Sequence, residues 1–340
     1  MQHERNIFGY LNGREVGSYI LSNLNGMRMC VLEYGCVIQS LEIPVAGRVL
    51  DVVLGFDNIE DYVSSHKLPA PPHFGAIIGR YSGRIKNGKF SIGDHHYQLN
   101  ANNGANTLHG GPVGFDKVLW EVHKVGTSSI TLRYLSVDGD ENFPGNVDVQ
   151  VTYTLTDSNE LVLEYSATSD ADTIINMTQH SYFNLDGHTG NVLDQDLFVN
   201  ASKILEVDQG IVPTGNIIAA EKVGFDFTNS RKCPDTIDDS FVIENPSAAA
   251  ATLTSASTGL QLTVTSDQPS VHLYIGGNLF GKMLGKQGVA YHPHSGICFE
   301  SQNYPDAPNN SHFPSAILRS GETYRQKTTW KFDQLNQSEQ

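Results

Sequence analysis

The sequence is poor in basic residues and has no long apolar run. Its 340 residues include 22 Lys and Arg against 37 Asp and Glu, which gives a formal net charge of −15. This negative field would repel a phosphate backbone or an anionic lipid surface, so neither nucleic acid nor a membrane is an expected partner. No stretch reaches the roughly 18 apolar residues that a membrane-spanning helix requires.

Cysteine is also scarce. The four cysteines form no CxxC pair and no regular framework: Cys30, Cys36, Cys233 and Cys298. Such usage is typical of reduced thiols in a cytoplasmic protein. Residues 1–9 lack the basic and then apolar pattern of a signal peptide, which favours the same location. We therefore expect a cytoplasmic protein.

Motifs for phosphate, metal and nucleophilic serine chemistry are missing. No GxxxxGK[ST], GxGxxG or GxSxG run occurs, and the histidine spacings match no HExxH or cysteine–histidine pattern. The segment that begins at Asp138 resembles the start of a calcium loop, but Phe143 stands at its sixth position, where the turn needs glycine. The sequence therefore predicts neither a metal nor another cofactor.

Period-two alternation of apolar and polar residues dominates the chain and indicates β-strands. Turn residues at 156–159 and at Gly93-Asp94 predict two hairpins, whereas a helix is expected only near residues 58–64, capped by Asn58 or Asp57. The Ala- and Ser-rich residues 247–258 suggest a surface hairpin or loop. We predict an all-β, large antiparallel protein in which residues 1–340 form a single domain.

Two segments carry candidate catalytic side chains. Glu300 follows an apolar run and precedes amide and aromatic groups, as at the end of a strand that borders a polar pocket. His180 lies among hydrogen-bonding residues between Asn176 and Asn184. One carboxylate and one imidazole are the minimum for moving protons in two directions, although a structural role for Glu300 is open at this stage.

Amide and aromatic residues are abundant near the predicted turns, and few positive charges accompany them. Sugar hydroxyls bind to amides and carboxylates, and apolar sugar faces rest on aromatic rings, so this composition suits a sugar better than an anionic metabolite. His109 lies in a Gly-rich turn, where the backbone can approach a ligand closely, but a structural role fits it too.

Six segments together resemble the aldose 1-epimerases, or galactose mutarotases: residues 74–85, 106–112, 138–145, 176–185, 237–241 and 300–309. The similarity runs through nearly the whole chain. It implies a galactose mutarotase-like β-supersandwich and a cofactor-independent isomerase of hexose and galactose metabolism. The implied reaction interconverts the α and β anomers of sugars such as glucose and galactose.

The resemblance also implies residue roles. Glu300 matches the general base that takes the proton from the anomeric hydroxyl, and His180 matches the general acid that protonates the ring oxygen. A Glu with an ordinary pKa of about 4.3 is charged near neutral pH and can accept a proton, and a His with a pKa of about 6.5 can supply one after only a small shift. The resemblance further implies four sugar-binding residues: Arg84, His109, Tyr182 and Asp238.

Two positions depart from the family pattern. Gly83 stands where many relatives carry Asn, and His272 stands where relatives often have Gln. These departures leave open which sugar is preferred and whether the reducing end of a disaccharide is accepted. The sequence is equally compatible with a monomer and a homodimer.

Two other functions compete with this hypothesis. A glycoside hydrolase would use Glu300 and Asp238 as paired carboxylates. A non-catalytic carbohydrate-binding protein would use the same scaffold without chemistry. His180 favours the epimerase, because a hydrolase needs a second carboxylate and simple binding needs no proton donor opposite a proton acceptor.

Overall fold

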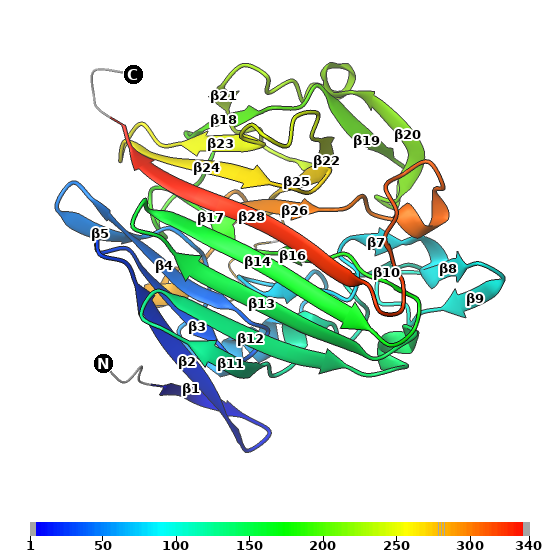
Figure 1. Ribbon diagram of the computed structural model, residues 1–340. Helices are drawn as coiled ribbons and strands as arrows, with labels where there is room; N and C mark the ends of the chain where they lie inside the picture. Colours follow the sequence, from blue (N-terminus) through cyan, green and yellow to red (C-terminus); the bar gives the residue numbers. More distant parts are fainter. Residues whose placement is uncertain (1–4, 278, 280, 282, 336–340) are drawn as a thin grey trace.

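The computed structural model describes residues 5–277, 279, 281 and 283–335 (Figure 1). Within these residues the chain forms a nine-stranded, a six-stranded and a five-stranded sheet, together with four two-stranded ladders. All the strand pairs in these sheets are antiparallel. The prediction of a large antiparallel all-β protein is therefore confirmed.

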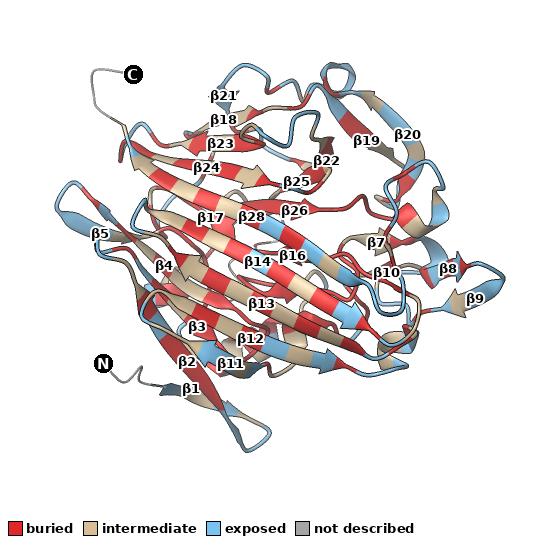
Figure 2. Ribbon diagram, viewed as in Figure 1, coloured by how far each residue is buried: buried red, intermediate tan, exposed pale blue. Residues whose placement is uncertain are grey.

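The nine-stranded sheet crosses the front of the molecule in Figure 1. Its strands, in spatial order, are β11 (Glu121–Val125), β12 (Ser129–Ser136), β13 (Val147–Leu155), β14 (Glu160–Ser169), β28 (Thr323–Gln334), β24 (Leu260–Ser266), β23 (Ala251–Thr254), β18 (Asp196–Val199) and β21 (Arg231–Lys232). Buried residues alternate with more exposed ones along β13, β14 and β28, as Figure 2 shows. This alternation is the structural counterpart of the period-two sequence pattern, because successive side chains of a strand point to opposite faces.

The six-stranded sheet carries most of the candidate site. Its order is β17 (Tyr182–Phe183), β26 (Ile297–Gln302), β25 (Ser270–Ile275), β22 (Asp238–Val242), β19 (Lys203–Val207) and β20 (Pro213–Ala219). It packs against the large sheet: the Phe183 ring lies edge-on to Trp330 with 4.8 Å between centroids, and Gln326 donates a hydrogen bond of 2.9 Å to the carbonyl of Ser301. As a result, every residue of β26 is buried.

The remaining strands flank this pair of sheets. The five-stranded sheet runs in chain order through β1 (Asn6–Leu11), β2 (Arg14–Ser22), β3 (Arg28–Leu32), β4 (Ile38–Val45) and β5 (Arg48–Asp51). The ladders pair β6 (Ile77–Ile78) with β16 (Thr178–Gln179), β7 (Arg84–Ile85) with β10 (Thr107–Leu108), β8 (Lys89–Ile92) with β9 (His95–Gln98), and β15 (Thr173–Ile174) with β27 (Ile317–Leu318).

Both predicted hairpins are confirmed, since β13 pairs with β14 around residues 156–159 and β8 pairs with β9 around Gly93-Asp94. The prediction for residues 247–258 is wrong in part. Residues 251–254 form strand β23 inside the nine-stranded sheet, with Ala251 and Leu253 fully buried. The apolar and polar alternation of this short strand is difficult to recognise because small residues surround it, and a run of small residues is typical of a loop.

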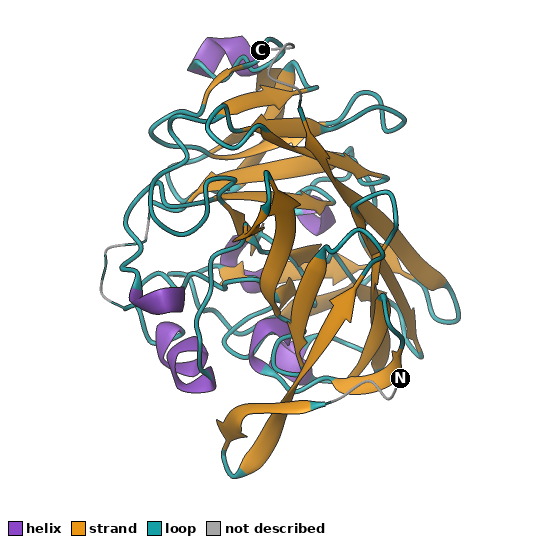
Figure 3. Cartoon of the chain, turned by 90° about the vertical axis from the view of Figure 1, so that its left-hand side faces the viewer, coloured by secondary structure: helices purple, strands orange, loops and turns teal. Residues whose placement is uncertain are grey.

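Within the described residues, helical structure consists of short segments between the strands (Figure 3). They are α1 (Ile59–Ser65) and the 3₁₀ turns η1 (Lys86–Gly88), η2 (Phe115–Lys117), η3 (Asp140–Asn142), η4 (Ala220–Val223), η5 (Lys286–Gly288) and η6 (Ala307–Asn309). In the described part of the chain, none of the helices has the length and apolar character needed to cross a membrane.

Helix α1 matches the predicted helix, and its cap gives a stability prediction. The side-chain oxygen of Asn58 accepts a hydrogen bond of 2.8 Å from the backbone N–H of Asp61. Asn58→Ala removes this cap, and we expect it to lower the free energy of unfolding by about 1 kcal/mol. Asn58→Ser keeps an acceptor for this backbone N–H and should lose much less. Urea unfolding of both variants checks this, and equal losses would contradict the capping role.

Candidate active site

A cavity of about 380 Å³ opens between the sheet ends and the loops that cover them. All of the predicted site residues line it: Arg84, His109, His180, Tyr182, Asp238 and Glu300. They come from separate parts of the chain, since Arg84 is in β7, Tyr182 in β17, Asp238 in β22 and Glu300 in β26. The fold therefore gathers the predicted set around one space.

Glu300 lies on the fully buried strand β26, opposite His272 on the neighbouring strand β25. The residue is only 2% exposed, and its Oε2 atom has no hydrogen-bond partner among the described residues. An unpartnered carboxylate oxygen in a buried position costs free energy unless it serves a ligand. We infer that this oxygen is available to a hydroxyl in the cavity.

His180 lies beside Glu300, with its Nε2 atom 3.6 Å from Oε1 of the carboxylate. The other ring nitrogen, Nδ1, faces the thiol of Cys298 at 3.5 Å. Because the protein occupies the Nδ1 side, Nε2 is the nitrogen available for proton exchange in the cavity. A carboxylate and an imidazole this close can act on two oxygens that share one carbon atom.

Burial shifts the pKa values of both groups strongly. It raises the pKa of Glu300 to about 7, and the positive charge of His272 limits the rise. Burial also lowers the pKa of His180, to about 3. The expectation of only a small shift for His180 is therefore wrong, because desolvation disfavours the charged form of each group. In the free pocket, a single proton shared by the pair resides on Glu300.

Arg84 and His109 form the wall next to this pair. Leu108, the residue before His109, is paired with Arg84 across the β7–β10 ladder, and Nε of Arg84 donates a hydrogen bond of 3.1 Å to Asn103. Nδ1 of His109 accepts the backbone N–H of Gly83 at 3.3 Å. Nε2 of His109 therefore carries the ring proton and is a donor, since burial lowers the pKa of this imidazole well below its ordinary value.

Asp238 and His272 form a second pair at the Glu300 end of the cavity. Nε2 of His272 lies 3.0 Å from Oδ1 of Asp238, and its Nδ1 lies 2.9 Å from the hydroxyl of Ser240. Burial alone would lower the pKa of His272, but the hydrogen bond to Asp238 and the charge of Glu300 outweigh it and raise the pKa. His272 therefore favours the cationic form beside two carboxylates.

The departure at Gly83 has a steric reason. The residue has a φ of +77°, and a Cβ atom there would lie 2.8 Å from the ring of Pro305. An asparagine side chain would therefore have to displace that proline. In this chain Pro305 lines the cavity at that point.

Comparisons with known proteins show which family this chain belongs to. The sequence profile of the family described as Aldose 1-epimerase matches residues 17–331. The chain is 38% identical to galactose mutarotase from Bos taurus over 318 residues, which cover 90% of this chain and 91% of that protein. It is 32% identical to aldose 1-epimerase from Escherichia coli K12, with 92% and 94% of the two chains covered. The chain belongs to the aldose 1-epimerase family.

Solved structures of the family share the fold. The aldose epimerase homologue from C. elegans superposes with a TM-score of 0.88 at 31% identity, over 94% of this chain and 100% of that chain. Galactose 1-epimerase from Lactobacillus acidophilus gives a TM-score of 0.84 at 26% identity, over 98% and 100%. The predicted galactose mutarotase-like fold and the family resemblance are confirmed. The roles of the individual site residues remain predictions.

His73 is among the cavity residues of this family member that sequence reasoning missed. It follows two prolines in a loop and belongs to no motif, so the sequence offers no signal for it. The structure brings it beside the predicted histidines, with ring centroids 5.2 Å from His109 and 5.7 Å from His180.

His272 allows a direct test of the electrostatics. The cationic imidazole stabilises the ionised form of Glu300, so His272→Gln removes a positive neighbour and raises the pKa of the carboxyl. We expect the alkaline limb of the rate–pH profile, where Glu300 loses its proton, to move to higher pH, and the maximal rate to fall. Polarimetric rates from pH 5 to 9 check this, and an unmoved limb would show that His272 is uncoupled from Glu300.

Proposed function

We propose that this chain is an aldose 1-epimerase that interconverts the α and β anomers of hexoses such as glucose and galactose. The observation that carries the proposal is the Glu300–His180 pair, 3.6 Å apart at the wall of one cavity, with an unpartnered carboxylate oxygen. O1 and O5 of a pyranose are bonded to the same carbon, so groups that exchange protons with them must be close neighbours. The pair meets this requirement.

Ring opening uses the pair in its charge-separated form. Glu300 takes the proton from O1 while protonated His180 gives its proton to O5, the C1–O5 bond breaks, and C1 becomes an aldehyde. Rotation about C1–C2 then presents the other face of the carbonyl. On closure the O5 hydroxyl attacks C1, His180 takes its proton back, and Glu300 returns a proton to O1.

Burial assists this proton movement. After ring opening Glu300 is protonated and His180 is neutral, which is the distribution that desolvation favours in the pocket. The transfer that opens the ring therefore neutralises two buried charges. Arg84 and the Nε2–H of His109 are placed to donate hydrogen bonds to sugar oxygens, and Asp238 and Tyr182 provide further polar contacts.

Polarimetry tests the proposal. Fresh α-D-glucose or α-D-galactose should approach its equilibrium rotation much faster with the protein than in buffer or with heat-inactivated protein. Methyl α-D-glucoside has no proton on O1, so it should neither mutarotate nor release a reducing end. Release of a reducing sugar would favour the glycoside hydrolase, and saturable sugar binding without acceleration would favour a binding protein.

Two further expectations accompany this function. We propose a cytoplasmic protein, which is supported by four cysteines that are all unpaired. We also propose that residues 1–340 form one domain, because one buried apolar cluster includes residues from Tyr19 to Phe332. The substrate is proposed to be a free monosaccharide.

A further inference from the structure

His73 stands against the two histidines of the proposed site. The three rings form a compact group, with centroids 5.2 Å apart for His73 and His109, 5.7 Å for His73 and His180, and 5.6 Å for His109 and His180. His73 lines the same cavity and is 9% exposed. His73 has no role in the reaction proposed above.

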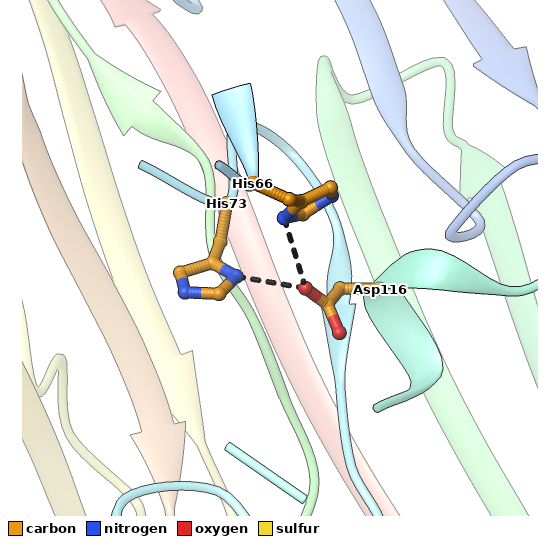
Figure 4. Close-up of side chains that lie close together, drawn as sticks. All are labelled: His66, His73 and Asp116. Atoms are coloured by element: carbon orange, nitrogen blue, oxygen red, sulfur yellow. Dashed lines mark hydrogen bonds and ion pairs between the residues drawn. The ribbon is translucent and has the colours of Figure 1, made fainter. Parts of the chain in front are cut away.

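Asp116 fixes the orientation of His73. Nδ1 of His73 lies 2.8 Å from Oδ2 of Asp116, a residue of η2 that is 1% exposed (Figure 4). Burial by itself raises the pKa of Asp116, but the hydrogen bond from His73 outweighs it and the pKa falls to about 2. The carboxylate accepts the Nδ1 proton, so Nε2 at the far side of the ring has a lone pair and can accept a hydrogen bond.

The backbone of His73 is unusual as well. Its φ is +52°, in the left-handed region that residues other than glycine rarely adopt. Such conformations persist where the surrounding structure holds them, and they cluster at functional sites. Here the left-handed turn places a buried imidazole on the wall of a sugar-sized cavity.

The cavity has two chemically distinct ends. Glu300 is surrounded by Asp238, His272 and Arg84, which are the charged groups that act on its pKa. His180 touches both ends, because its Nε2 is near Glu300 and its ring also packs against His73. Neither His73 nor Asp116 is among the groups that act on Glu300, so we place both at the His180 end of the cavity.

This placement corresponds to one part of the sugar. If Glu300 acts at O1 and His180 at O5, the ring continues past O5 to C5, which carries the C6 hydroxymethyl group. We propose that His73, held by Asp116, accepts a hydrogen bond from the C6 hydroxyl and makes the site selective for hexoses that have it. This inference rests on the proposed function, since the assignment of O5 to His180 orients the sugar.

The same side chains offer the donor set of a divalent metal, because ligand atoms of His66, His73 and Asp116 all lie within 4.8 Å of one another. Two observations favour the hydrogen-bonded role. Ligands at about 2.0 Å from a tetrahedral zinc ion stand about 3.3 Å apart, whereas Nδ1 of His73 and Oδ2 of Asp116 are only 2.8 Å apart. In addition, the ammonium of Lys117 lies 3.8 Å from the same carboxylate oxygen and supplies the counter-charge.

The test compares D-glucose with 6-deoxy-D-glucose, which retains the C6 carbon but lacks its hydroxyl. The chosen variant is His73→Asn, because asparagine tolerates the left-handed backbone while its shorter amide cannot reach the position of Nε2. His66→Asn is the matched control. Nδ1 of His66 lies 3.6 Å from the same Asp116 oxygen, but His66 does not contact His180 or His109 through its ring.

We expect the unaltered protein to prefer glucose over the deoxy sugar by about 10-fold in kcat/KM, as for one neutral hydrogen bond. His73→Asn should reduce this ratio to about one, mainly by weakening the reaction of glucose, whereas His66→Asn should preserve it. Asp116→Asn should give an intermediate ratio, because the His73 ring then loses the carboxylate that accepts its Nδ1 proton and fixes its orientation.

Three outcomes would overturn the inference. The first is an unchanged ratio of kcat/KM for glucose to that for the deoxy sugar in folded His73→Asn. The second is an equal loss of rate for both sugars in that variant. The third is a change of the ratio in the unaltered protein on addition of EDTA or Zn²⁺, which would indicate a metal site. An unaltered protein that accelerates neither sugar would instead refute the proposed function. Thermal unfolding of each variant establishes that it is folded.

Discussion

Replacing Glu300 with glutamine is expected to lower kcat for mutarotation by about 10²- to 10⁴-fold. Glutamine keeps the size of the side chain and its place on β26, but it cannot accept the O1 proton. The carboxylate is buried and its Oε2 has no partner among the described residues, so the substitution removes the proton acceptor that is available to the sugar. Polarimetry with α-D-glucose, corrected for the spontaneous reaction, measures the loss.

The matched control for this change is Glu164→Gln. Glu164 lies exposed on β14, so the same substitution there removes one negative charge without touching the cavity. We expect its rate to equal that of the unaltered protein. If Glu300→Gln kept full activity while folded, the carboxylate would not be the base and the proposed proton exchange would be wrong.

Replacing His180 with glutamine should cost a similar factor, about 10² to 10⁴ in kcat, and should also reverse the pH dependence. In the unaltered protein kcat/KM should fall above about pH 7, because the Glu300–His180 pair then loses its shared proton. In His180→Gln the residual reaction needs only an ionised Glu300, so it should rise as pH passes through the pKa of that carboxyl. Rates from pH 5 to 9 separate the two profiles.

His123→Gln provides the control, since His123 is exposed on β11 and is not among the residues that line the cavity. Its profile should match that of the unaltered protein. A His180→Gln variant that loses rate but keeps the original alkaline limb would mean that another group supplies the proton to O5.

Much of the fold and the predicted set of site residues could be derived from the sequence, for a physical reason. Strands of a half-buried sheet need alternation, and turns need glycine, asparagine or aspartate, so β13, β14 and the hairpin between them follow from local pattern. Glu300 and His180 lie in long segments whose combination of residues is distinctive. Their common cavity is a tertiary feature that only the fold could establish.

Other features lay beyond the sequence. His73 and Asp116 are 43 positions apart, and nothing near either residue indicates that they meet. The pKa values of Glu300 and His180 depend on how completely the sheets exclude water, which no local pattern encodes. Likewise, the packing of Pro305 against Gly83 explains why asparagine is absent at position 83, and this contact is visible only in the folded structure.

The position of β28 has a consequence for how the protein is made. This strand is the last of the described strands to be synthesised, yet it lies inside the nine-stranded sheet, between β14 and β24. Until residues 323–334 leave the ribosome, both neighbours present open edges that invite pairing with other chains. Closure of the sheet, and with it the dry surroundings of Glu300, must therefore wait until residues 323–334 have emerged, and chaperone protection is most valuable before that moment.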